Sequence, residues 1–466
     1  MMEVTMQLWN TTDELKKSGT GTFTINNGKL TIDNEDHFRK HSVDQLVGNA
    51  VFAENESVKN LARWTIWEAS LALGCPPSSI NDFYMARAAD GWKDMTTPAI
   101  NIRALTYDTM RTIFRTLQAM DATACLFEIA KSEISYTMQR PSEYATCALA
   151  AALRENYRAP VFVQGDHFQA NAKNYTVDRQ KEIEGLKKLI TEGIDAGFYN
   201  IDVDSSTLVD LSRKTILEQQ RDNFEVAAEL TAHIRSLQPK GVTVSVGAEI
   251  GEVGGKNSTV EELVAFMEGY NGALTSKGKL AGISKISVQT GTEHGGVVLP
   301  DGSIAKVKLD LDVLKKLGEV ARTQFKNGGA VQHGASTLPE SAFGNFAQCQ
   351  AVEVHLATAF QNALYDSKAF PNDLKQKIYR WLDENCATER KPDWTPEQFY
   401  YKTRKKGFGP FKKELWSLDE KTRGALMSDL QKLFTTIFTG LGIKGSRKTV
   451  ERFVKPALVH KPCPTT

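Results

Sequence analysis

The chain has 466 residues, and its 57 basic and 56 acidic side chains nearly cancel. A chain of this length is too long for one small core, so we expect two or three domains, or one large α/β domain with additions. The balanced charge gives no broad electrostatic footprint for nucleic acid or for an anionic membrane, which favours a small polar substrate as partner.

Cysteine usage and hydropathy indicate the compartment in which the protein is expected. Six cysteines are scattered without a Cys-x-x-Cys spacing, which argues against a disulfide framework or a thiolate zinc site and predicts reduced, mostly buried thiols. The first residues lack the basic and then apolar segments of a signal peptide, and no run approaches the roughly 20 apolar residues of a membrane span. We therefore expect a cytoplasmic protein without membrane contact.

Residues 1–95 are predicted to form an N-terminal extension. The sequence from 27 onward reads as a small strand pair followed by helices. This pattern is typical of a cap or docking segment rather than of a repeat of the pattern that follows.

Alternation of strand and helix begins near residue 98. Short β-rich runs recur, each followed by a polar or glycine-rich turn and then by a helical stretch. The runs are 98–103, 123–130, 159–167, 196–206, 241–251, 283–296, 328–336 and 351–358. Eight alternations predict an α/β fold, a (β/α)8 TIM barrel over residues 96–365. A doubly wound sheet is the alternative, because periodicity alone does not show closure.

Residues 366–466 are predicted to form an α-helical C-terminal extension. Its aromatic side chains offer more apolar surface than a free tail leaves in water, so we expect the helices to pack on the barrel or on a neighbouring subunit. A basic and aromatic stretch, 399–416, resembles an RNA or phosphate contact. Charge runs on helical tails are more often solvated faces, and we interpret it so.

Ionisable residues gather where the predicted strands end. The stretch 161–175 starts as a buried strand and then places Asp166 beside His167, and three further histidines, His294, His333 and His355, follow later strands. Active sites of such barrels form at this rim. Imidazoles from separate strands suit a divalent ion such as zinc, and Asp204 and Glu249 reach the same rim, so one or two ions could be held.

Six motifs then resemble one family. They are GDH at 165–167, DVDSS at 202–206, GAEIGEVGG at 247–255, GTEHGG at 291–296, QHGAS at 332–336 and EVHLAT at 353–358. In this order they resemble the class II, metal-dependent fructose-bisphosphate and tagatose-bisphosphate aldolases, in a long form with terminal extensions. Each motif alone is weak, but six in the right order and spacing are specific.

The resemblance implies roles for particular residues. The residues matching the zinc ligands are His167, His294 and His333, whereas Asp204 and Glu249 match a second or alternative metal position. Asp166 matches the residue that exchanges a proton at the bond made or broken. Such a reaction leaves an enediolate whose negative charge zinc stabilises as a Lewis acid.

A phosphate site is expected at the last strands. Glycine-rich turns and hydroxyl groups there can donate hydrogen bonds to an anion, although tight turns also need glycine for steric reasons alone. The resemblance assigns phosphate or substrate contacts to Asn101, Gly295, Gly334, Ser336 and Thr358.

Three positions depart from the family pattern, and all of them concern the substrate. The family's acidic loop residue, which handles a second proton transfer, matches Asn257. Either Glu252 or Glu293 takes over this role, or the substrate differs, or lyase activity is lost. The family has asparagine where His355 stands, which we expect to face the substrate, and serine where Ala130 stands, beside Lys131 and Ser132.

Two functions follow as hypotheses. The first is a zinc-dependent aldolase that reversibly cleaves a ketose bisphosphate, with fructose 1,6-bisphosphate giving dihydroxyacetone phosphate and glyceraldehyde 3-phosphate, as in glycolysis. The second is a catalytically silent or altered-substrate barrel that binds metal and sugar phosphate in a regulatory or partner-supporting role. Asp166 favours the first, because a purely structural metal site does not need it. The family also suggests a homo-oligomer, a dimer or larger.

Overall fold

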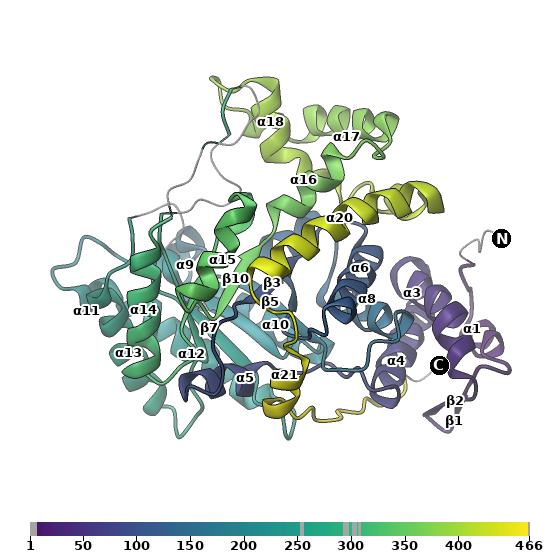
Figure 1. Cartoon of the computed structure of the whole chain (residues 1–466), viewed down its shortest axis with the longest axis horizontal. Helices are drawn as coiled ribbons and strands as arrows, with labels where there is room; N and C mark the ends of the chain where they lie inside the picture. The colour runs from purple at the N-terminus through teal and green to yellow at the C-terminus, as the bar shows by residue number, and fades with distance from the viewer. Residues whose placement is uncertain (1–6, 252–255, 292–297, 301–304, 306–308, 465–466) are drawn as a thin grey trace.

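The computed structural model describes residues 7–251, 256–291, 298–300, 305 and 309–464. Its centre is a closed barrel of parallel strands ringed by helices (Figure 1). The strands are β3 (Thr97–Asn101), β4 (Leu126–Ala130), β5 (Phe162–Gln169), β6 (Asn200–Asp204), β7 (Ser245–Glu249), β8 (Lys285–Val288), β9 (Ala330–Gln332) and β10 (Glu353–Leu356).

Each of the eight predicted runs overlaps one of these strands, so the predicted TIM barrel is confirmed. The strands follow one another around the barrel in chain order, and β10 closes it by pairing with both β3 and β9. An open doubly wound sheet has two unpaired edges and is therefore excluded. All residues of β3, β4, β6 and β7 are buried, as expected for parallel strands covered on both faces.

Several of the helices around the barrel, though not all of them, begin at a residue whose side chain caps the first turn. The bounds of the helices around the barrel are α6 (Thr106–Ala119), α7 (Lys131–Tyr136), α8 (Pro141–Arg154), α9 (Ala172–Val177), α10 (Arg179–Ala196), η2 (Ser206–Leu208), α11 (Ile216–Gln219), α12 (Arg221–Leu237), α13 (Val260–Thr275), α14 (Leu311–Thr323), η3 (Ala335–Thr337), η4 (Glu340–Ala342), α15 (Phe343–Gln348) and α16 (Thr358–Asp366). For example, Asp178 caps α10, and Gly197 ends it with a φ of 100° that favours glycine.

The barrel interior contains ionisable groups where branched apolar side chains usually dominate. The interior polar cluster consists of Glu128, Gln164, Asp202, Lys285 and Glu353, all buried. The Lys285 ammonium donates to Gln164 Oε1 at 2.8 Å, to Asp202 Oδ2 at 3.0 Å and to Glu353. Gly247 leaves room for this cluster, because a Cβ there would lie 2.2 Å from Asp202 Oδ1. One cation is therefore shared among several buried acceptors.

The N-terminal segment packs on one side of the barrel. It comprises α1 (Thr12–Ser18), the hairpin of β1 (Phe23–Asn26) and β2 (Lys29–Ile32), α2 (Glu35–His37), η1 (Phe38–Ser42), α3 (Val43–Phe52), α4 (Glu56–Ala72) and α5 (Asn81–Ala88). Helices α3 and α4 contact the barrel helix α8. The predicted boundary at residue 95 stays a prediction.

The C-terminal segment is helical: α17 (Asn372–Asn385), η5 (Ala387–Glu389), α18 (Pro396–Thr403), η6 (Arg404–Gly407), α19 (Lys412–Trp416), α20 (Glu420–Gly440) and α21 (Arg447–Phe453). In Figure 1, α17, α18 and α20 lie at the end of the barrel where α16 begins. Helix α20 contacts α6 and α16, and the Phe434 ring lies 4.8 Å from that of Phe360. Phe399, Phe434 and Phe438 are fully buried, so this segment packs on the barrel.

The state of the cysteines and the hydropathy of the helices agree with the expectations from sequence. All six cysteines are free and five of them are buried, which confirms the predicted reduced thiols. Among the described residues, every helix is too short or too polar to cross a membrane.

Candidate active site

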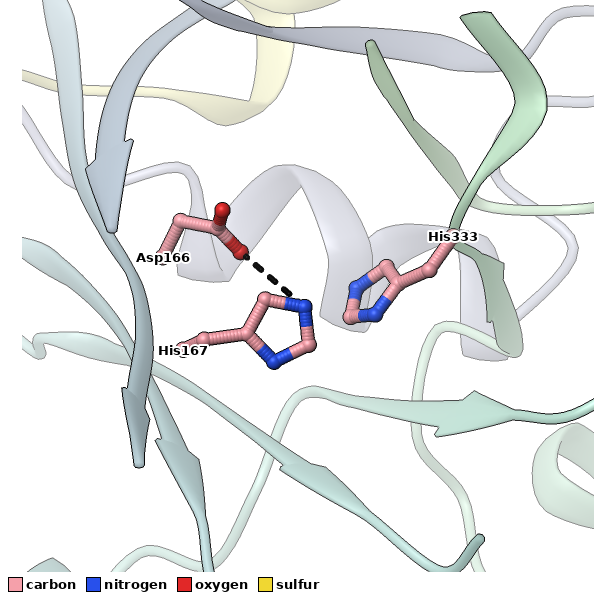
Figure 2. Close-up of side chains that lie close together, drawn as sticks. All are labelled: Asp166, His167 and His333. Atoms are coloured by element: carbon pink, nitrogen blue, oxygen red, sulfur yellow. Dashed lines mark ion pairs between the residues drawn. The ribbon is translucent and has the colours of Figure 1, made fainter. Parts of the chain in front are cut away.

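Strand β5 contains an irregularity that positions residues of the candidate site. The sequence predicts that the strand ends at Asp166 and His167, but β5 continues to Gln169. Its pairing with β6 shifts register between Gly165 and Phe168, and His167 has a φ of 41°. Neighbouring side chains on a regular strand point to opposite faces. This β-bulge lets Asp166 and His167 both reach the barrel mouth, as Figure 2 shows.

The backbone at this bulge is strained. A left-handed conformation is uncommon for residues other than glycine, and sparsely populated conformations of this kind cluster at functional sites. Gly165 stabilises the arrangement, because a Cβ there would lie 2.5 Å from the Phe168 ring. The ring therefore packs where a larger residue at 165 would put a side chain.

Two histidines and two carboxylates gather beside the bulge. His167 Nδ1 lies 2.8 Å from Asp204 Oδ2 and 3.4 Å from Glu249 Oε2. His333 Nδ1 lies 3.8 Å from the same Glu249 oxygen, and the rings of His167 and His333 are 4.3 Å apart between centroids. Figure 2 shows the two imidazoles facing each other from β5 and from the end of β9.

This donor set fits a divalent cation. Ligand atoms of Asp166, His167 and His333 lie within 4.8 Å of one another, and so do those of His167, Asp204 and Glu249. Imidazole nitrogens with carboxylate oxygens are the donors that zinc and similar ions take. Burial and the neighbouring Asp204 charge raise the pKa of Glu249 to about 7, and a bound cation would reverse this shift.

Some predicted residues lie outside the described part of the chain. They are His294, Gly295, Glu252 and Glu293. The predicted third imidazole ligand and one predicted phosphate contact therefore stay predictions from sequence. Asn257 is described, and its side-chain amide donates to Asp310 Oδ2 at 3.1 Å.

Asp166 is positioned as an ionised acceptor. The Asn101 side-chain amide donates to Asp166 Oδ2 at 2.8 Å, and His355 Nδ1 lies 3.1 Å from Asp166 Oδ1. Burial alone would raise the pKa of Asp166, but the imidazoles of His167 and His355 hold it well below its ordinary value. A carboxylate that stays ionised at neutral pH can accept a proton during a reaction.

His355 connects the site to the interior polar cluster. Its Nδ1 also lies 3.1 Å from Glu128 Oε1, and its Nε2 lies 2.6 Å from Glu353 Oε1. Burial, together with the Asp166 charge, raises the pKa of Glu128 to about 8. His355 lies on the wall of the cavity described next, but both of its ring nitrogens face carboxylates.

A cavity of about 320 Å³ opens above these residues. Its lining includes eight residues predicted from sequence: Asn101, Asp166, His167, Glu249, Gly334, Ser336, His355 and Thr358. His333 and Asp204 lie behind this surface, both almost fully buried. Helix α16 begins at Thr358, whose backbone N–H donates to Ser336 Oγ at 3.2 Å. Helix N-termini are suited to anions, so this part of the cavity can take a phosphate.

Sequence reasoning missed other lining residues. These are Arg103, Glu133, Tyr136, Gln169, Ser206, Ala357, Gln361, Tyr401, Lys402 and Lys405, whereas Ala130 and Ser132, which the sequence placed near the substrate, do line the cavity. Arg103 follows Asn101 by two residues, so strand alternation could have indicated it. Tyr401, Lys402 and Lys405 belong to the stretch 399–416, and its interpretation as a solvated face was wrong for these three residues.

Comparison with known proteins assigns the chain to a family. The family model "Fructose-bisphosphate aldolase class-II" matches residues 85–405, well over half of the chain. The chain belongs to this family. Class II aldolases generally depend on divalent metal ions and act on sugar phosphates, and the cluster of buried carboxylates and imidazoles agrees with the first of these properties.

Solved structures show the same fold at low identity. A protein described as a probable tagatose 6 phosphate kinase from Sinorhizobium meliloti 1021 has a TM-score of 0.54 at 14% identity, covering 74% of this chain and 100% of that one. A glycerol-complexed fructuronate-tagaturonate epimerase from Cohnella laeviribosi has a TM-score of 0.50 at 12% identity, covering 86% and 91%.

A fructose-bisphosphate aldolase from Campylobacter jejuni has a TM-score of 0.47 at 17% identity, covering 78% of this chain and 95% of that one. At such identities these likenesses concern the fold alone. A comparison with curated protein sequences finds no match.

Proposed function

We propose that this class II aldolase is a zinc-dependent enzyme that reversibly cleaves a ketose bisphosphate. Fructose 1,6-bisphosphate, which gives dihydroxyacetone phosphate and glyceraldehyde 3-phosphate, is the substrate we put first. The observation that carries the proposal is the Asp166 carboxylate beside the imidazoles of His167 and His333, with Asp166 and His167 on the wall of a cavity of about 320 Å³.

The metal site in this proposal uses His167, His333 and the predicted ligand His294. Asp204 and Glu249 hold a second or alternative ion position, supported by their short distances to His167. A bound divalent cation supplies Lewis-acid stabilisation of the negative charge that develops on the substrate oxygens.

Asp166 moves the proton. In the cleavage direction it accepts the proton of the hydroxyl on one of the two carbons of the breaking bond, and this carbon becomes the carbonyl carbon of the released aldehyde. The electron pair of the broken bond remains on the other fragment as an enediolate. Asn101 donates to one Asp166 oxygen, so the carboxylate is held in one orientation before the substrate arrives.

In this proposal one phosphate of the substrate binds at the first turn of α16. Gly334, Ser336 and Thr358 line this part of the cavity, and backbone N–H groups and hydroxyls there donate hydrogen bonds. Gly334 has a φ of 69°, a conformation that favours glycine. Gly295 stays a predicted further contact.

The second proton transfer has no assigned residue. The family position for the loop acid is Asn257, whose amide cannot replace a carboxylate as a base. The hypothesis of a catalytically silent barrel rests on three departures from the family pattern, at Asn257, His355 and Ala130. Asp166, with its hydrogen bond from Asn101, favours the enzyme, because a metal site with a structural role alone needs no ionised neighbour of this kind.

A metal-binding experiment tests the ligand assignment. Replacing His167, His294 or His333 with Ala is expected to lower zinc affinity by about 10-fold or more, since each supplies a direct ligand bond and even the partners that orient ligands are worth this much. The measurement is the zinc content of each purified variant after competition with a chelator, alongside its cleavage rate.

The matched control is His460→Ala, because His460 is exposed, contacts Glu68 and is not among the residues that line the cavity. Full zinc occupancy in any of the three barrel variants would remove that residue from the site.

The proposal also includes a cytoplasmic location and a homo-oligomeric assembly, both of which are predictions from sequence.

A further inference from the structure

We propose that His355 is a positioning residue, which holds the Asp166 carboxylate by tying it to the interior polar cluster. This inference rests on the proposed function, since it concerns the group that moves the proton. The sequence places His355 at a position expected to face the substrate, and the contacts of its ring give it a different task.

Both ring nitrogens of His355 are engaged by carboxylates. Nδ1 lies 3.1 Å from Asp166 Oδ1 and 3.1 Å from Glu128 Oε1, and Nε2 lies 2.6 Å from Glu353 Oε1. An ionised carboxylate only accepts hydrogen bonds, so the ring satisfies these contacts best with hydrogen on both nitrogens. His355 is 6% exposed, and its two nitrogens are committed to protein groups rather than to the substrate.

His355 completes the hold on Asp166. The Asn101 amide donates to Asp166 Oδ2 at 2.8 Å, and His355 Nδ1 lies 3.1 Å from the other oxygen, Oδ1. One donor on each oxygen fixes the plane of the carboxylate as well as its position. A hydrogen bond between an imidazolium and a carboxylate is charge-assisted and about twice as strong as a neutral one, so His355 is the stronger of the two restraints.

Glu353 anchors the other side of the imidazole ring. Its Oε1 accepts from Lys285 Nζ and, at 3.0 Å, from Gln164 Nε2, and its Oε2 accepts from Tyr84 Oη. Gln164 Nε2 also donates to Glu128 Oε2 at 2.8 Å. These groups come from four strands of the barrel and from α5, and all are buried. The ring therefore cannot turn without breaking several bonds between buried polar groups.

The N-terminal segment reaches Asp166 through these contacts. Tyr84 lies on α5, and its hydroxyl is linked through Glu353 and His355 to the base at the barrel mouth. A displacement of about 1 Å in a catalytic group can cost roughly 100-fold in rate. Helix α5 therefore contributes to the alignment of Asp166, although it supplies no residue to the cavity lining.

The kinetics of His355→Asn separate positioning from substrate contact. This variant restores the family's residue, and its side chain is too short to bridge Asp166 and Glu353. We expect kcat to fall about 10-fold or more and KM to change by less than about threefold, because the base is misplaced while substrate binding is kept. The zinc content should equal that of the wild type. A wild-type kcat, or a loss carried by KM alone, would overturn the proposal.

The effect of His355→Asn should depend on the Asp166 carboxylate. In the Asp166→Asn background, the same substitution should cost less than about twofold further in kcat, because no carboxylate remains to be aligned. An equal loss in both backgrounds would show that His355 acts independently of Asp166, which contradicts the proposal.

Tyr84→Phe tests the far end of the chain of contacts and serves if His355→Asn folds poorly. It removes only the hydroxyl that donates to Glu353, and kcat should fall by about threefold or more, the equivalent of one hydrogen bond. The matched control is Tyr270→Phe, because that buried hydroxyl donates to Thr231 between α12 and α13. The control should keep the wild-type kcat. Equal kcat values in the two variants would argue against any link from the interior polar cluster to the base.

A readout independent of activity is the magnetic resonance of the His355 ring. In zinc-loaded protein with isotopically labelled histidine, the hydrogens on Nδ1 and Nε2 should give protected resonances that are absent from His355→Asn. Asp166→Asn should shift the Nδ1 hydrogen, and Tyr84→Phe should shift the Nε2 hydrogen.

The outcome is separable from that of the proposed function. A wild type that shows both shifts but cleaves no ketose bisphosphate would keep the positioning contact and remove the lyase activity. A wild type that cleaves, but whose His355 resonances do not respond to Asp166→Asn, would keep the lyase activity and overturn the positioning role.

Discussion

Replacement of Asp166 with Asn is expected to lower turnover by about 100-fold or more while leaving zinc bound, in line with general-base contributions of roughly 10² to 10⁴. The amide has nearly the shape of the carboxylate and cannot accept the proton of the substrate hydroxyl. His167, which would still hold the metal, keeps its contacts with Asp204 and Glu249 in this variant.

Zinc affinity and cleavage rate measured on one preparation of Asp166→Asn separate two roles. If Asp166 instead orients His167, whose Nε2 lies 3.7 Å from Asp166 Oδ1, the variant should lose zinc and regain activity with added metal. Asp373→Asn, an exposed residue in the first turn of α17, is the control and should behave as the wild type. An unaffected rate in Asp166→Asn would contradict the mechanism and favour the silent barrel.

Replacement of Lys285 with Met should lower the free energy of unfolding far more than replacement of an exposed lysine does. The substitution removes the ammonium that Asp202 and Glu353 share and leaves them with His355 alone, and breaking a buried ion pair from one side costs about 3 to 5 kcal/mol. Lys285 is 1% exposed and contacts both carboxylates, so water cannot replace the lost charge. Methionine has a similar length, which limits the contribution of an empty cavity.

The measurement is the shift of the denaturant or thermal unfolding midpoint. Lys40→Met is the matched control, because Lys40 makes an exposed pair with Asp36, and such pairs contribute about 0 to 1 kcal/mol. Adding Asp202→Asn to Lys285→Met should recover part of the loss. Equal midpoints for the Lys285 and Lys40 variants would show that the interior polar cluster does not depend on its cation.

The sequence predicts the barrel well because the signals are local. Short β-rich runs alternate with amphipathic stretches, and each of the eight runs overlaps one strand of the barrel. Closure could not be read from any one run, since it depends on the pairing of β10 with β3, more than 250 residues apart in the chain.

The site is predictable in part for a geometric reason. Parallel strands of a barrel end at one rim. Asp204, Glu249 and His333 therefore converge there independently of the conformations of the loops. The bulge at His167 was not predictable, because it arises from a register shift against β6. The sequence also gave no sign that the nitrogens of His355 would face Glu128 and Glu353.

The C-terminal contribution shows a further limit. Lys405 lies in a basic stretch that has the composition of a solvated helix face. Its position on the cavity follows from contacts between Arg404 and α16, which are long-range and depend on the fold. Composition therefore identified the segment but could not place its side chains.

The most direct test is an aldol cleavage assay over a panel of ketose phosphates, with and without a chelator. The enzyme should cleave a ketose bisphosphate, lose that activity when the metal is removed, and regain it when zinc is restored. Cleavage that persists in the metal-free protein would contradict the metal-dependent mechanism. Absence of cleavage across the panel, in zinc-loaded protein that still binds a sugar phosphate, would contradict the lyase and favour the silent barrel.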